Sequence, residues 1–159
     1  MTIHNLRKDY SYFLKKVVAH GAEKGISEIS TKVIAEEIGI TEPTIYVHFH
    51  TRVNLLLNAN EYALHEIVSA FADNDATLLQ RWELALKAAN EHKEAALYAY
   101  FYRQLNTSDE FDKIFGDLLS DVTPIKASIL EHYLYQAACG SLELNEENVK
   151  NTFAIISSL

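Results

Sequence analysis

Residues 42–48 carry four side chains of the types that read the edges of DNA bases. The carboxylate of Glu42 can accept a hydrogen bond from a cytosine amino group, and the hydroxyl of Thr44 can donate or accept one. Val47 offers an apolar surface to a thymine methyl group, and His48 can donate to a base or a phosphate. These side chains are therefore candidate readers of DNA bases if a helix presents them together on its outward side.

Other kinds of site find little support in the sequence. His48 and His50 are two positions apart, which turns their rings away from each other on a helix, and no cysteine pair or H-E-x-x-H run completes a zinc site. There is also no glycine-rich phosphate loop and no nucleophile elbow. We therefore expect no metal, no cofactor and no enzymatic activity. The single cysteine, Cys139, cannot form an internal disulfide and is expected to be a small buried side chain.

Two short helices are expected to position the DNA-reading residues. In the first, over residues 30–38, apolar side chains at helical spacing form one face, and Gly39 ends it where a left-handed residue is needed. Ser30 and Thr31 both stand at its start, and either hydroxyl can cap the helix or contact a phosphate. The sequence alone leaves that choice open.

The second short helix is predicted to begin near Glu42. Thr41 can accept from backbone N–H groups freed at its start, and Pro43 suits a first turn, where no N–H partner is needed. Its inward side carries Ile45 and Phe49, with the ring of Tyr46 at the margin. Two short helices joined by a glycine turn form a helix-turn-helix.

The composition predicts an all-α protein. With 5 Gly, 2 Pro and 48% hydrophobic residues in 159 positions, the chain has few helix breakers and no alternating β-type runs. No apolar run reaches the length of a membrane span, and the first ten residues do not have the pattern of a signal peptide, so a cytoplasmic protein without a membrane association is expected.

About nine helices are expected in total. Residues 1–51 should form a DNA-binding domain, the head, and residues 52–159 a regulatory and dimerisation domain, the body. Besides the two short helices, the apolar periodicity predicts helices over residues 5–24 with Asn5 as N-cap, 52–72, 76–92, 94–105, 108–119, 124–139 and 145–158.

The net charge of −8 is unfavourable for a DNA-binding protein, but the charge is unevenly distributed. Residues 1–56 contain seven Lys or Arg and six Asp or Glu, whereas the rest of the chain contains seven and sixteen. An acidic body is repelled by the phosphate backbone and so helps to turn the head toward it.

The run I-A-x-x-I-G-I-T-x-P-T-I-Y-x-H-F, followed by Thr51-Arg52 and a Leu-Leu pair, resembles the DNA-binding domain of the TetR family of bacterial repressors. It is most similar to the tetracycline-repressor branch, which also has a proline in this turn. The resemblance implies that the Tyr46 hydroxyl binds a phosphate, that Arg52 anchors the next helix to the DNA backbone, and that Lys32 reads a base or a phosphate. For Lys32 and Arg52 the plain alternative is solvated surface charge. The full candidate DNA-binding set is Thr31, Lys32, Thr41, Glu42, Pro43, Thr44, Tyr46, Val47, His48 and Arg52.

The resemblance further implies a homodimer that binds an inverted-repeat operator and a repressor that is released by a small-molecule effector. Aromatic residues of the body are candidates for an effector pocket, although core or dimer packing explains each of them equally well: Tyr98, Phe101, Tyr102, Phe115 and Tyr133. The last two helices are the expected dimer interface, with candidates Ile129, Tyr133, Val149, Phe153 and Ile156. The competing functional hypothesis is a protein-interaction or signal-binding module of the same fold that binds DNA weakly or not at all.

Overall fold

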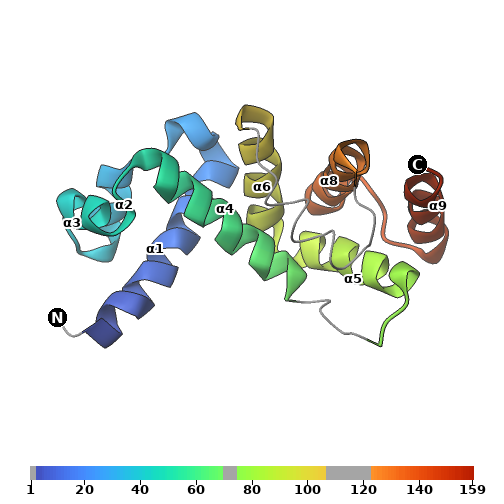
Figure 1. The fold of residues 1–159 in the computed structure, drawn as a ribbon, viewed down its shortest axis with the longest axis horizontal. Helices are drawn as coiled ribbons and strands as arrows, with labels where there is room; N and C mark the ends of the chain where they lie inside the picture. The colour runs from blue at the N-terminus through green and yellow to red at the C-terminus, as the bar shows by residue number, and fades with distance from the viewer. Residues whose placement is uncertain (1–2, 70–74, 107–122) are drawn as a thin grey trace.

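The computed structural model describes residues 3–69, 75–106 and 123–159. These parts of the chain contain α-helices and one short 3-10 helix and no strand, which confirms the all-α prediction (Figure 1). The helix predicted over residues 108–119 lies outside the described residues. The helices are α1 (Ile3–Lys24), η1 (Ile26–Glu28), α2 (Thr31–Ile38), α3 (Glu42–Phe49), α4 (Arg52–Val68), α5 (Leu78–Glu91), α6 (Lys93–Leu105), α8 (Pro124–Cys139) and α9 (Glu146–Ser157).

Most helix ends follow from local capping chemistry. Thr77 begins α5 with a capping box, in which its hydroxyl accepts from the backbone N–H of Gln80 while the Gln80 side chain accepts from the backbone N–H of Thr77. Thr123 caps α8 through its hydroxyl, which accepts from the backbone N–H of Lys126, just before Pro124. The predicted cap at Asn5 is wrong, because α1 begins at Ile3 and already includes Asn5.

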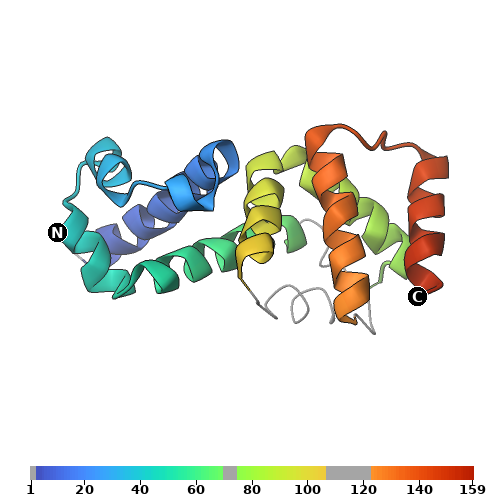
Figure 2. The same ribbon diagram turned by 90° about the horizontal axis from the view of Figure 1, so that it is seen from above.

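The molecule is elongated, with the head at one end and the body at the other (Figures 1 and 2). Helices α1 to α3 lie at the N-terminal end, and α5, α8 and α9 lie at the C-terminal end. Between them α6 packs against both α1 and α4, so the head and the body meet along these three helices.

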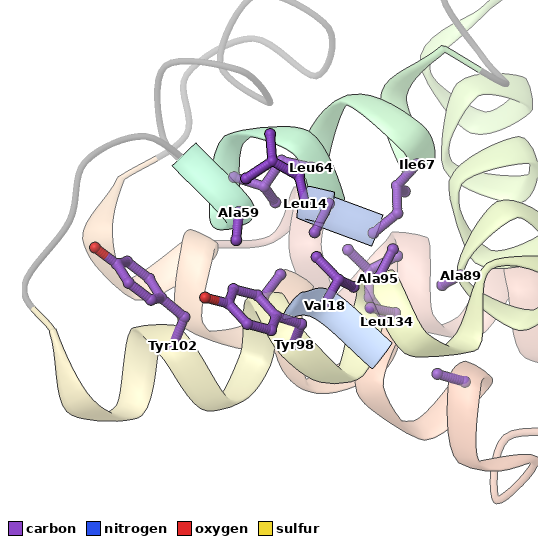
Figure 3. Packing of buried hydrophobic residues seen from close by; sticks show 14 of the residues in the cluster. Leu14, Val18, Ala59, Leu64, Ile67, Ala89, Ala95, Tyr98, Tyr102 and Leu134 are labelled. Atoms are coloured by element: carbon purple, nitrogen blue, oxygen red, sulfur yellow. The ribbon is translucent and has the colours of Figure 1, made fainter. Parts of the chain in front are cut away.

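A single hydrophobic core runs through this junction. Figure 3 shows side chains from α1, α4, α5, α6 and α8 packed together, among them Val18, Leu64 and Leu134. Alanines on α5 and α6, such as Ala89 and Ala95, let the helices approach closely. At the far end of the core the buried indole N–H of Trp82 donates to the hydroxyl of Thr152 over 2.9 Å, which joins α5 to α9.

Two side chains near the ends of α8 are exposed. Ile125 is exposed in the first turn of α8, before the buried positions Ala127 and Leu130. Cys139 was expected to be buried and is exposed in the last turn, next to the left-handed Gly140. None of the described helices is both long and apolar enough to span a membrane.

Candidate nucleic-acid interface

The turn between α2 and α3 has the geometry that its sequence predicts. Gly39 is left-handed, with φ 76° and ψ 29°, and its N–H donates to the carbonyls at the end of α2. The N–H of Ile40 then donates to the carbonyl of Ala35 over 3.0 Å, which closes the turn. At the other end of α2 the hydroxyl of Ser30 accepts from the backbone N–H of Val33. Ser30 is therefore the cap, and Thr31 is not.

Helix α3 is held against the head by two buried side chains. Ile45 and Phe49 are almost inaccessible to solvent, as the sequence pattern predicts. Tyr10 of α1 stacks on Phe49, with ring centroids 4.6 Å apart and an interplanar angle of 14°. The inward side of α3 is thus fixed, and its other side can be presented rigidly to a partner.

The outward side of α3 carries Val47, which is 70% exposed, and His48, which is also exposed. Thr44 is half-buried, and its hydroxyl lies 2.8 Å from the hydroxyl of Thr41. Thr41 makes no side-chain bond to the helix N-terminus, so the prediction that it caps α3 through its hydroxyl is wrong. Its short side chain pairs with Thr44 instead, one turn along.

Glu42 is more constrained than predicted. The hydroxyl of Thr31, which is only 5% exposed, donates to Oε1 of Glu42 over 2.7 Å. The Tyr46 hydroxyl lies 3.4 Å from the same Thr31 oxygen. An ionised carboxylate only accepts, so the single proton of Thr31 goes to Glu42, and Tyr46 must be the donor to Thr31. Glu42 is therefore half-buried at the edge of the surface and is held there, whereas the sequence placed it on the outward face.

The two basic candidates differ in where they lie. Of the two, Lys32 is exposed on α2. Pro43, an uncharged member of the candidate set, is also exposed, in the first turn of α3. Arg52 is half-buried, and its Nη2 donates to the carbonyl oxygen of Ile26 over 3.4 Å. The solvated-charge interpretation is therefore wrong for Arg52, whose guanidinium turns toward the segment that follows α1.

The connection from α3 to α4 was not predicted in any detail. His50 has φ 65° and ψ −51°. It is the only non-glycine residue with a positive φ in the part of the chain that the structure describes. The N–H of Thr51 donates to the carbonyl of Phe49 over 2.8 Å, so His50 is the centre of a γ-turn. Thr51 then caps α4 by accepting from the N–H of Asn54. Nothing in the sequence around His50 indicates a γ-turn.

The aromatic residues proposed for an effector pocket make their ring contacts at different places in the described residues. Tyr98 and Tyr102 are buried and stack on each other in α6. Phe101 lies edge-on to Tyr135, and Tyr133 lies edge-on to Trp82. Phe115 lies outside the described residues. A shallow depression elsewhere, at the start of α5, is lined by Asp75, Ala76, Gln80, Glu83, Leu84 and Lys87.

The residues proposed for the dimer interface divide into two groups. Val149 and Ile156 are only 6% and 9% exposed, so they pack mainly within their own chain. Ile129, Tyr133 and Phe153 are half-buried at the edge of the core. The outward apolar surface of α9 comes mainly from Ala154 and Ile155, which the candidate set omitted.

Comparison with known proteins agrees with this geometry. The family model described as bacterial regulatory proteins of the tetR family matches residues 21–59, and no curated protein sequence matches the chain. A crystal structure of a TetR family transcription regulator from Marinobacter aquaeolei VT8 is similar with a TM-score of 0.70 and 20% identity, over 96% of each chain. A TetR-like transcriptional regulator from Rhodococcus sp. RHA1 is similar with a TM-score of 0.60 and 16% identity, over 91% of each chain. Residues 21–59 of the chain therefore match the tetR family model, and the described helices have the fold of these TetR-type regulators.

Proposed function

We propose that the chain is a sequence-specific DNA-binding transcriptional regulator that places α3 in the major groove. The observation that carries this proposal is the position of Val47, a large apolar residue that is 70% exposed on a helix whose other side is anchored by Ile45 and Phe49. An outward apolar residue on such a rigid helix contributes nothing to the core. It is suited to contact a thymine methyl group in the groove.

The neighbouring side chains divide into base-reading and phosphate-binding groups. Thr44, His48 and the second carboxylate oxygen of Glu42 are the groups of α3 that we assign, with Val47, to base edges. Lys32, exposed on α2, is the positively charged candidate for a phosphate. Tyr46 can reach a phosphate only by giving up its hydrogen bond to Thr31, because its hydroxyl has a single proton.

The proposal includes a homodimer on an inverted-repeat operator. One short helix reads only a few base pairs, so useful specificity requires two heads, with half-sites about one helical turn, roughly 34 Å, apart or somewhat more. The action that we propose is repression, relieved when a small molecule binds the body. Residues 1–51 then form the DNA-binding domain and residues 52–159 the regulatory domain.

A salt titration tests the proposal against its alternative. Phosphate contacts release counterions, so the logarithm of the affinity for mixed genomic DNA must fall steeply and linearly with the logarithm of the salt concentration. Footprinting of selected DNA should then show two protected half-sites. The alternative is a protein-interaction module that uses the acidic body, and it predicts a flat salt dependence and no footprint. A single asymmetric half-site protected by a monomer would contradict the dimeric proposal.

A further inference from the structure

Tyr98 is a residue of the body whose side chain reaches the head. It lies in the middle of α6, is completely buried, and packs among residues of α1 and α4 (Figure 3). A Cβ atom added to Gly21 of α1 would lie 2.6 Å from Cδ2 and 2.7 Å from Cε2 of the Tyr98 ring, closer than packed carbon atoms approach. The ring therefore occupies the space that a side chain at position 21 would need.

The hydroxyl of the same side chain reaches a different helix. It donates to the backbone carbonyl oxygen of Leu56 in α4 over 3.0 Å. Burial, and to a smaller extent Tyr102, raises the pKa of Tyr98, while the positive charge of Arg52 acts in the opposite direction. The phenol thus keeps its proton and remains a donor at every physiological pH.

Arg52 makes a second link at this junction. It stands one turn before Leu56 on α4, and its guanidinium donates to the carbonyl of Ile26, in η1 just after α1. Helix α4 is therefore linked to η1 by Arg52 and to α6 by Tyr98. Both links are part-buried, where a polar group that loses its partner is costly.

We propose that Tyr98 is the positioning residue through which the body sets the orientation of the head, because one rigid side chain holds α1 at Gly21 and α4 at Leu56 together. A phenol ring cannot bend, so a shift of α6 that carries the ring must carry both helices with it. Helix α4 does not swing independently of α1. The head turns as one unit with α6, and this link is how a signal received by the body would reach the two DNA-reading helices proposed above.

The distance between a head residue and a body residue tests this proposal without DNA. Spin labels are placed on cysteines at Glu36 of α2 and Glu91 of α5, both exposed, in a Cys139→Ser background because Cys139 is exposed and would also be labelled. Labelled chains are diluted with unlabelled chains so that only distances within one chain are measured. We expect a single narrow distance distribution for the parent protein and a broadened one for Tyr98→Leu.

Tyr133→Leu is the control, because Tyr133 is also a body tyrosine but is packed at the edge of the core against Trp82, away from the head. It should keep the narrow distribution. Gly21→Ala should shift the mean distance, since the added methyl group must displace the buried ring. In the Gly21→Ala/Tyr98→Leu double variant, the mean distance between the labels should shift no further than in Tyr98→Leu alone. The leucine side chain is shorter and leaves room for the methyl group at position 21.

The proposal is overturned if Tyr98→Leu keeps the parent distribution, or if Tyr98→Leu and Tyr133→Leu broaden it equally. If Tyr98→Leu does not fold, Tyr98→Phe decides, because it keeps the ring and loses only the bond to Leu56. A narrow parent-like distribution in both Tyr98→Phe and Gly21→Ala would also overturn the proposal.

A second measurement links this positioning role to the proposed function. On selected inverted repeats whose half-sites are moved apart stepwise, the parent protein should show a sharp optimum of spacing. Tyr98→Phe should flatten that optimum while keeping the affinity for a single half-site. A parent protein that binds no DNA contradicts the proposed function and leaves the distance measurement, and the positioning role that it tests, intact.

Discussion

The hydroxyl of Thr31, at the start of α2, donates to Oε1 of Glu42, at the start of α3, over 2.7 Å. This bond fixes the carboxylate of Glu42 and leaves its second oxygen available as an acceptor. A fixed negative charge near DNA disfavours every sequence that offers it no donor, so it contributes to specificity by rejecting the wrong bases.

Glu42→Ala should therefore remove a preference for cytosine at one base position, worth about 1 kcal/mol or more, and raise the affinity for mixed DNA. Thr31→Val should weaken the same preference, because the carboxylate is no longer held. The measurement is selection from a random DNA library followed by competition titrations. Glu36→Ala removes an exposed acid of α2 and serves as the control, which should change no base preference. An unchanged cytosine preference in Glu42→Ala would exclude Glu42 as a base reader.

Val47→Ala should change the preference at a thymine position by about 1 kcal/mol, because the lost methyl groups are those proposed to contact the base. Val53 provides a matched control, since it is the same residue type with the same 70% exposure but lies in the first turn of α4. Val53→Ala should leave all base preferences unchanged. If both variants only scale the affinity for every sequence alike, Val47 does not enter the groove.

Lys32→Ala should weaken binding to all sequences about equally and reduce the slope of the salt dependence by roughly 1. Arg52→Ala should instead lower the thermal unfolding midpoint, because the Arg52 guanidinium is half-buried and bonded to Ile26. Its effect on the salt slope should be smaller than that of Lys32→Ala. The sequence resemblance alone predicts instead that Arg52→Ala mainly reduces the salt slope, because it assigns Arg52 to the DNA backbone. For Lys32, equal salt slopes in the parent protein and in Lys32→Ala would rule out the phosphate contact.

The proposed dimer interface is best tested at Ile155 of α9, which is 47% exposed. Ile155→Glu should give monomers that remain helical, because a charge at the interface would be buried without a partner. Phe153→Glu should also give monomers but should lower stability as well, because Phe153 packs partly in the core of its own chain. Sedimentation analysis measures the assembly state, with Val53→Glu, in the first turn of α4, as the control. A stable dimer of Ile155→Glu would place the interface elsewhere.

The helix-turn-helix could be predicted from the sequence because its determinants are local. Gly39 ends α2, Pro43 stands in the first turn of α3, and Ile45 and Phe49 recur at helical spacing, so each acts over a few residues. The bounds of α8 also follow from local signals, with Pro124 at the start and Gly140 just beyond the end. Capping and periodicity need no knowledge of the rest of the fold, so the sequence by itself determined these helices and the outward position of Val47.

The directions of individual polar side chains were decided only by the tertiary structure. Arg52 turns toward Ile26, and Thr31 is buried against Glu42, because the neighbouring elements bring an acceptor to each of them. Tyr98 and Leu56 are 42 positions apart, and nothing in the sequence around either of them indicates that they form a bond. A buried hydrogen bond forms wherever packing brings a donor to an acceptor, and that packing is a property of the whole core.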